Sequence, residues 1–108
     1  MLLRWLRRRA EAEEERARAG RKARATIVDV GSSNVQDQRQ SVVVRLRLEV
    51  REAGREPVGR TVAWEVQAAQ LGRIVPGAEL PVKIDNEDDE RVYPGVGWAQ
   101  WSETGRRR

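Results

Sequence analysis

Apolar and polar residues alternate along the middle of the chain, most clearly over residues 41–51. An alternation with period two predicts a β-strand with one buried face and one wet face. A second alternating run covers 58–67, and the turn-forming segment 53–57 between them is short, so the two runs predict an antiparallel hairpin. The apolar positions of the first run are Val42, Val44, Leu46, Leu48 and Val50.

The segment before this hairpin predicts another strand. Residues 23–30 are rich in β-branched side chains, which favour strands. Ile27 and Val28 are both apolar and break the alternation, so we expect a β-bulge or a strand shared between two sheet faces. Residues 31–39 are polar and contain turn-forming residues, and they predict a loop.

The second half of the chain predicts two turns and two shorter strands. Segment 67–73 loses the β pattern and suits a single helical turn, while 75–78 has the Pro and Gly of a type II turn. Residues 79–85 predict a fourth strand, and Pro81 indicates that this strand lies at a sheet edge. Residues 91–93 predict a short fifth strand.

Five strands with a helical turn between the third and the fourth follow the element order of an OB-fold barrel. We therefore expect an all-β fold: a small five-stranded OB-like barrel, or a related small barrel, with a helical N-terminal arm. The inward residues of the strands should form one core. These residues are Val42, Val44, Leu46, Leu48, Val62, Trp64, Val66, Leu80, Val82 and Ile84.

The two ends of the chain differ from its middle. Residues 2–19 are mostly strong helix formers with Glu and Arg at helical spacing, and they predict a charged helix. We divide the chain into a charged helical arm (1–21), a small β-barrel domain (22–96) and a basic tail (97–108). Within the tail we expect Trp98 and Trp101 to close one end of the small core, because exposed Trp is unusual in a monomer.

The net charge of +4, from 21 basic and 17 acidic residues, suggests an anionic partner at first sight. The positive excess, however, lies at the two ends, because residues 25–95 hold nine basic and twelve acidic side chains. A barrel that wraps a phosphate backbone should itself be basic. The charge distribution therefore weakens a nucleic-acid role for the barrel.

Composition excludes several kinds of chemistry. The chain has no Cys and no His, which excludes disulfides, the usual zinc sites and histidine-based catalysis. The acidic segment 85–90 lacks the glycine and the ligand spacing of a calcium-binding loop, so we interpret it as a solvated turn. We expect no enzyme activity, no cofactor and no metal.

The arm begins with an apolar and basic tip that could contact a partner. Trp and Arg are residues that protein hot spots use, and they also suit an anionic membrane surface. The two alternatives are open at this point. The candidate contact residues are Leu2, Leu3, Trp5, Leu6, Arg7 and Arg8.

The outward face of the hairpin offers a second candidate, in Arg45, Arg47 and Arg51. OB folds bind single strands by stacking bases on aromatic residues within a positive groove. No aromatic residue occupies the outward positions of either hairpin strand, and Trp64 shares its parity with the core residues. A wet face of mixed charge is therefore the favoured interpretation.

Together these features predict a non-catalytic interaction module whose partner is a protein, a second copy of the chain or, weakly, an anionic membrane. The alternative is an OB-type protein that binds single-stranded nucleic acid. No apolar run reaches the length of about 20 residues that crosses a membrane, and 1–6 is too short for a signal-peptide core. We expect a cytoplasmic protein, with peripheral contact to the membrane as an open alternative.

The run Ala25-Thr26-Ile27-Val28, the long hairpin, the Leu-Gly-x-x-x-Pro-Gly segment at 71–77 and Arg91-Val92-Tyr93 resemble a group of small bacterial OB-like β-barrel domains. The resemblance covers about residues 23–94. Members of that group often follow a membrane helix, and we expect none in this chain. The group has no established activity, so the resemblance implies a fold and no site residues.

Overall fold

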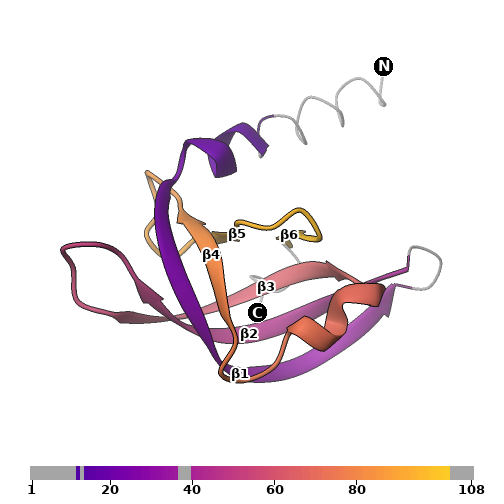
Figure 1. The fold of residues 1–108 in the computed structure, drawn as a ribbon. Helices are drawn as coiled ribbons and strands as arrows, with labels where there is room; N and C mark the ends of the chain where they lie inside the picture. The colour runs from indigo at the N-terminus through magenta and orange to yellow at the C-terminus, as the bar shows by residue number, and fades with distance from the viewer. Residues whose placement is uncertain (1–11, 13, 37–39, 103–108) are drawn as a thin grey trace, which may run out of the picture.

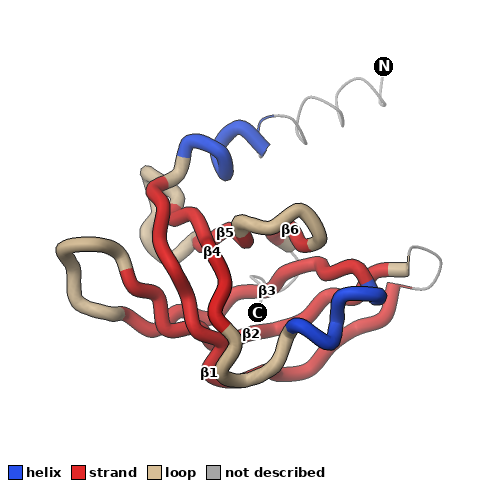
Figure 2. The backbone as a smooth tube through the Cα atoms, viewed as in Figure 1, coloured by secondary structure: helices blue, strands red, loops and turns tan. Residues whose placement is uncertain are grey.

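A computed structural model describes residues 12, 14–36 and 40–102 of the protein. A helical segment at 14–19 precedes six strands and a short 3-10 helix (Figures 1 and 2). The elements are β1 (Arg21–Gln36), β2 (Ser41–Arg51), β3 (Val58–Gln67), η1 (Ala68–Arg73), β4 (Glu79–Ile84), β5 (Val92–Pro94) and β6 (Ala99–Trp101).

All six strands belong to one antiparallel sheet in the order β5-β4-β1-β2-β3-β6. The sheet curls so that its two edge strands, β5 and β6, come close to each other. The result is a nearly closed barrel (Figure 1). The expected all-β barrel is confirmed, with six strands in the described residues where five were expected.

The long strand β1 connects the two halves of the barrel. Its first part pairs with β4, from Arg21↔Ile84 to Thr26↔Glu79, and from Arg24 to Gln36 it pairs with β2 on its other side. The register with β2 shifts immediately after Ile27, so the expected β-bulge is confirmed. The expected loop at 31–39 is wrong for 31–36, because β1 continues there and pairs with the start of β2.

The predicted core forms as expected. All ten predicted positions are buried, and Trp64 and Leu46 have no exposed surface. Five further residues complete the same cluster, among them Ile27 of β1 and Val92 of β5. Alternation along β2 and β3 therefore brings one continuous apolar layer to the inside of the curled sheet.

Part of the expected tail completes the barrel. Residues Ala99–Trp101 form β6, which pairs with β3 through Trp64↔Trp101. Trp98 and Trp101 are partly buried and pack against the core, so the expectation that they pack on the barrel is confirmed. The expected basic tail is therefore wrong for 99–101, where β3 offers a free edge to a short apolar segment.

The seam between β5 and β6 is closed by side chains. The ring of Trp101 meets that of Tyr93 edge-on, with 5.9 Å between centroids. The guanidinium of Arg91 lies 4.7 Å from the Trp101 ring and 5.5 Å from the Tyr93 ring. Trp64 donates a hydrogen bond from Nε1 to the Val92 carbonyl at 3.0 Å, which joins β3 to β5.

The turn before β4 has the expected type II form. Gly77 has a φ of 94°, and the Ala78 amide donates to the Val75 carbonyl at 3.1 Å. The edge position expected for the next strand is wrong for most of β4, which lies between β1 and β5. Strand β5 pairs only with residues 82–84 of β4. Pro81 lies just outside this paired segment, so its missing N–H removes no hydrogen bond between β4 and β5.

Candidate functional site

The helical arm is fixed to the barrel at Asp85, which directly follows β4. Asp85 is 1% exposed. Arg16 donates from Nε to Oδ1 at 3.2 Å and from Nη2 to Oδ2 at 2.9 Å. This fork geometry makes a strong, directional contact, because both guanidinium donors meet both carboxylate oxygens. The solvated turn expected at 85–90 is therefore wrong at its first residue.

The charge of Asp85 is held by further donors. Tyr93 donates its hydroxyl proton to Oδ1 at 2.7 Å, and the Glu87 amide donates to Oδ2 at 3.0 Å. Burial alone raises the pKa of Asp85, but the hydrogen bonds from Arg16, Tyr93 and Glu87 outweigh it and lower the pKa to about 2. Burial and the bond to Asp85 raise the pKa of Tyr93 to about 12. The carboxylate is thus ionised and the phenol neutral at physiological pH.

The last turn of the arm helix is capped by the barrel. Lys83 Nζ donates to the Arg18 carbonyl at 2.9 Å, and Asn86 Nδ2 donates to the Ala19 carbonyl at 2.8 Å. Carbonyls at a helix C-terminus lack partners within the helix, and a cation there also suits the helix dipole. The arm therefore meets the barrel through an ion pair from the half-exposed Arg16 to a buried carboxylate and through a satisfied helix end.

Gly20 lets the helix end approach β4 closely. A Cβ at this position would lie 2.7 Å from the Ile84 carbonyl oxygen, closer than real Cβ atoms come to backbone. A side chain here would push the arm away from the strand. Glycine at 20 therefore belongs to the docking geometry of the arm.

The tip residues proposed for partner contact, Leu2, Leu3, Trp5, Leu6, Arg7 and Arg8, lie outside the described residues. The arm can be followed from 14 onward, where it is helical as expected. Within the part of the chain that the structure describes, no helix is long and apolar enough to cross a membrane.

The three arginines of the nucleic-acid alternative do not form one available cluster. Arg45 and Arg47 are exposed on β2. Arg51 at the end of β2 is engaged, because its guanidinium pairs with Glu79 at 2.8 Å and with Glu49 at 3.4 Å. Trp64 lies in the core, as the strand parity predicted.

A different set of basic side chains lines a shallow hollow at the foot of the arm, on the outer side of β1 and β4. Lys22 and Arg24 come from β1, Arg51 from β2 and Lys83 from β4, and no carboxylate of the described residues lines the hollow. Ala23, Ala53, Pro81, Val82 and Gly95 provide the rest of its surface. We call this feature, with a volume of about 520 Å³, the basic hollow.

Strand register brings these cations together. Lys22 lies directly opposite Lys83 across the β1–β4 pair, and Arg24 lies directly opposite Arg51 across the β1–β2 pair. Like charges in directly opposed positions destabilise a sheet. Glu79 offsets part of this repulsion by pairing with Arg51 and, at 3.6 Å, with Arg24. Among the described residues, no carboxylate lies within ion-pair distance of Lys22 or Lys83.

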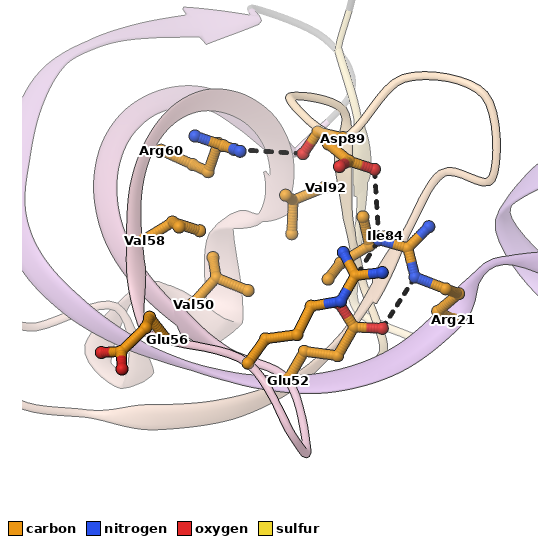
Figure 3. A pocket seen from close by; sticks show the side chains of 10 residues that line it. Arg21, Val50, Glu52, Glu56, Val58, Arg60, Ile84, Asp89 and Val92 are labelled. Atoms are coloured by element: carbon orange, nitrogen blue, oxygen red, sulfur yellow. Dashed lines mark hydrogen bonds and ion pairs between the residues drawn. The ribbon is translucent and has the colours of Figure 1, made fainter.

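A second, smaller pocket at one end of the barrel is already closed by charge pairs (Figure 3). Its apolar floor consists of Val50, Val58, Ile84 and Val92, and its volume is about 70 Å³. Arg21 bridges Glu52 at 2.7 Å and Asp89 at 3.1 Å above this floor. The hydrogen bond from Arg21 lowers the pKa of Glu52. This carboxylate is therefore held ionised by a neighbour and closes the end of the core.

Sequence reasoning missed both the Asp85 contact and the basic hollow. Asp85 stands at the start of an acidic run, and such runs are usually solvated. Its burial depends on an arginine 69 positions away. The basic hollow depends on register between strands that are far apart in the chain. The only local sign of the basic hollow in the sequence is the group of three cations within 21–24, next to the end of the arm.

Comparison of the chain with known protein families, with curated proteins and with solved structures finds no match.

Proposed function

We propose that the chain is a non-catalytic interaction module in which a small barrel holds a helical arm toward a partner. The observation that carries this proposal is the forked contact from Arg16 to the buried Asp85, together with the capped helix end at Arg18 and Ala19. A surface helix without a binding role does not need an ion pair to a buried carboxylate 69 positions away along the chain.

An anchored arm is useful for binding because its direction is already set. Association costs free energy for every segment that must be ordered, so a helix held at its barrel end loses less freedom when its other end binds. The tip residues Leu2, Leu3, Trp5, Leu6, Arg7 and Arg8 precede this anchored turn in the sequence. We propose that they make the partner contact, with a protein, another copy of the chain or an anionic membrane surface, in the cytoplasm.

The lowered pKa values of the carboxylates of Asp85 and Glu52 support a binding role over a catalytic one. A general acid or base works best with a pKa near the operating pH. The pKa values of Asp85 and Glu52 are instead lowered by hydrogen bonds from Arg16 and Arg21. Both carboxylates form ion pairs that join different elements of the fold, and both remain ionised near neutral pH.

The test is affinity capture from extracts of the cells that make the protein, with four forms of the full chain. The tip variant combines Leu2→Ser, Trp5→Ser and Leu6→Ser. Arg16→Gln removes the anchor, and Arg18→Gln is the matched control because the side chain of Arg18 makes no hydrogen bond or ion pair in the described residues. Sedimentation velocity of the same four proteins measures self-association.

We expect the intact chain and the Arg18→Gln control to retain the same partner, or the same dimer. The tip variant should lose it, and Arg16→Gln should weaken it, because the arm then binds without a preset direction. Equal capture and equal association by all four forms would contradict the proposed role of the arm.

A further inference from the structure

We propose that the basic hollow binds lipid phosphates of an anionic membrane, so that the barrel contacts the same surface as the tip of the arm. This inference rests on the proposed function, because it assigns the partner of the arm. The site consists of Lys22, Arg24, Arg51 and Lys83, contributed by three strands.

Unbalanced charge is the first reason. The two directly opposed like-charge pairs, Lys22↔Lys83 and Arg24↔Arg51, place four cations beside one another. One carboxylate, Glu79, serves both arginines, while in the described part of the chain neither lysine has a carboxylate partner. An external anion at the hollow would relieve the remaining repulsion.

The shape and lining of the hollow favour a lipid surface over nucleic acid. Single strands are held by bases stacked on aromatic rings, and in the part of the chain that the structure describes no aromatic residue lines the hollow. Its surface combines cations with small apolar groups, among them Ala53 and Pro81. That combination suits phosphates above an apolar boundary, where Lys and Arg are attracted by the surface potential.

The position of the hollow is a further reason to propose membrane binding. Lys83 lines it and also donates to the Arg18 carbonyl at the end of the arm helix, so the hollow lies at the foot of the arm. Figure 1 shows the helix leaving the barrel beside the first part of β1 and the end of β4. A short apolar tip gives only marginal membrane binding by itself, and stable attachment takes a second signal such as a basic patch. The basic hollow provides that second signal.

The experiment measures sedimentation of the full chain with vesicles of phosphatidylcholine alone and of phosphatidylcholine mixed with phosphatidylglycerol. The hollow variant combines Lys22→Gln and Arg24→Gln, which leaves the hydrogen bond from Lys83 to the arm helix in place. The matched control combines Arg45→Gln and Arg47→Gln, which removes the same charge from exposed positions of β2 outside the hollow. Circular dichroism and thermal unfolding confirm that each variant is folded.

We expect binding to the mixed vesicles only, weakened about thirtyfold in the hollow variant, which corresponds to about 1 kcal/mol for each of the two cations removed. The control should lose far less. An equal loss in both variants, or no loss in the hollow variant, would overturn the proposal. So would tighter binding of a single-stranded oligonucleotide that also depends on Lys22 and Arg24, because it would assign the hollow to nucleic acid.

The tip variant separates this inference from the proposed function. If the tip variant loses vesicle binding and the hollow variant keeps it, the arm has its proposed role and the hollow does not. If the hollow variant loses binding and the tip variant keeps it, the hollow is a membrane site and the proposed role of the arm fails.

Discussion

Asp85 illustrates how the environment of one residue can keep a carboxylate charged inside a small barrel. Its two oxygens receive four hydrogen bonds, from Arg16, Tyr93 and the Glu87 amide. Removing one partner from such a buried contact leaves the others unsatisfied, which costs more than the contact itself contributes. The anchor of the arm should therefore be sensitive to substitution on either side.

The lowered pKa of Asp85 predicts an acid-sensitive contribution to stability. The pKa lies at about 2 in the folded protein, below the ordinary 3.8. The ionised carboxylate therefore stabilises the fold above about pH 4, and this contribution is lost as pH falls through about 2. Asp85→Asn should lower the free energy of unfolding at pH 7 by about 1.5–3 kcal/mol and flatten its acid dependence.

Urea denaturation at pH values from 7 to about 2 measures this effect. Asp29→Asn is the control, because Asp29 is exposed on β1. An unchanged acid dependence in Asp85→Asn would contradict the role assigned to this carboxylate.

Leu46 tests the core at the same scale. It has no exposed surface and lies in the middle of β2, opposite Val62. Leu46→Ala should lower the free energy of unfolding by about 2–4 kcal/mol, because the side chain loses its packing and leaves a cavity. The neighbouring exposed Arg47→Ala should change it by less than about 0.5 kcal/mol. Similar values for both, measured by urea denaturation, would refute the assignment of Leu46 to the core.

At the scale of elements, the arm and β4 form one unit through close backbone approach. Gly20→Ala should destabilise the protein by about 1–3 kcal/mol, because the added methyl would meet the Ile84 carbonyl at 2.7 Å and the arm must shift. Gly72→Ala in η1 is the matched control, because a Cβ there meets nothing within 4 Å.

Thermal unfolding compares the two variants, and proteolysis reports on the junction. Cleavage near 16–20 should accelerate in Gly20→Ala and remain unchanged in Gly72→Ala. Equal stability and equal cleavage would show that the approach of Gly20 to β4 is unimportant for docking the arm.

The elements also show which parts of the fold could be predicted from sequence. Strands β2 and β3 alternate over about ten residues each, so their bounds and most of their buried positions followed from the pattern alone. In β3 the alternation fails at Val58, which is exposed, and at Ala63, which is buried. The end of β1 could not be predicted, because Gly31, Ser32 and Ser33 are poor strand formers. The register with β2 shifts between Val30 and Ser33, and pairing from Ser33 to Gln36 continues the strand. Strand β6 has only three residues and depends on the free edge of β3.

The candidate site was less predictable than the core for the same physical reason. A core position is marked by its own side chain, whereas the basic hollow and the Asp85 anchor are defined by which distant residues come together. The pairs Lys22↔Lys83 and Arg16–Asp85 join opposite ends of the chain. Local periodicity contains no information about such register.

At the scale of the whole molecule, the barrel depends on the seam between β5 and β6. Trp101→Ala should lower the free energy of unfolding by about 1–3 kcal/mol, because a partly buried ring that contacts Tyr93 and Arg91 is lost. Gln100→Ala, on the exposed side of the same strand, is the control.

Hydrogen exchange locates the change. Exchange should accelerate in β5 and β6 of Trp101→Ala, while β1, β2 and β3 keep their protection, because local opening starts where few strand pairs hold the backbone. Uniform acceleration across the sheet would show that the seam is no weaker than the rest of the barrel.

The anchored arm also decides how the molecule responds to mechanical load. A pull on the arm reaches the Arg16–Asp85 contact and the two capping hydrogen bonds before it reaches the sheet. The next contact along the chain is the pair Arg21↔Ile84, where β1 begins to pair with β4. From Arg24 to Thr26, β1 is paired on both sides. If the barrel is tethered through its arm, we therefore expect these contacts to break before β1 separates from the sheet.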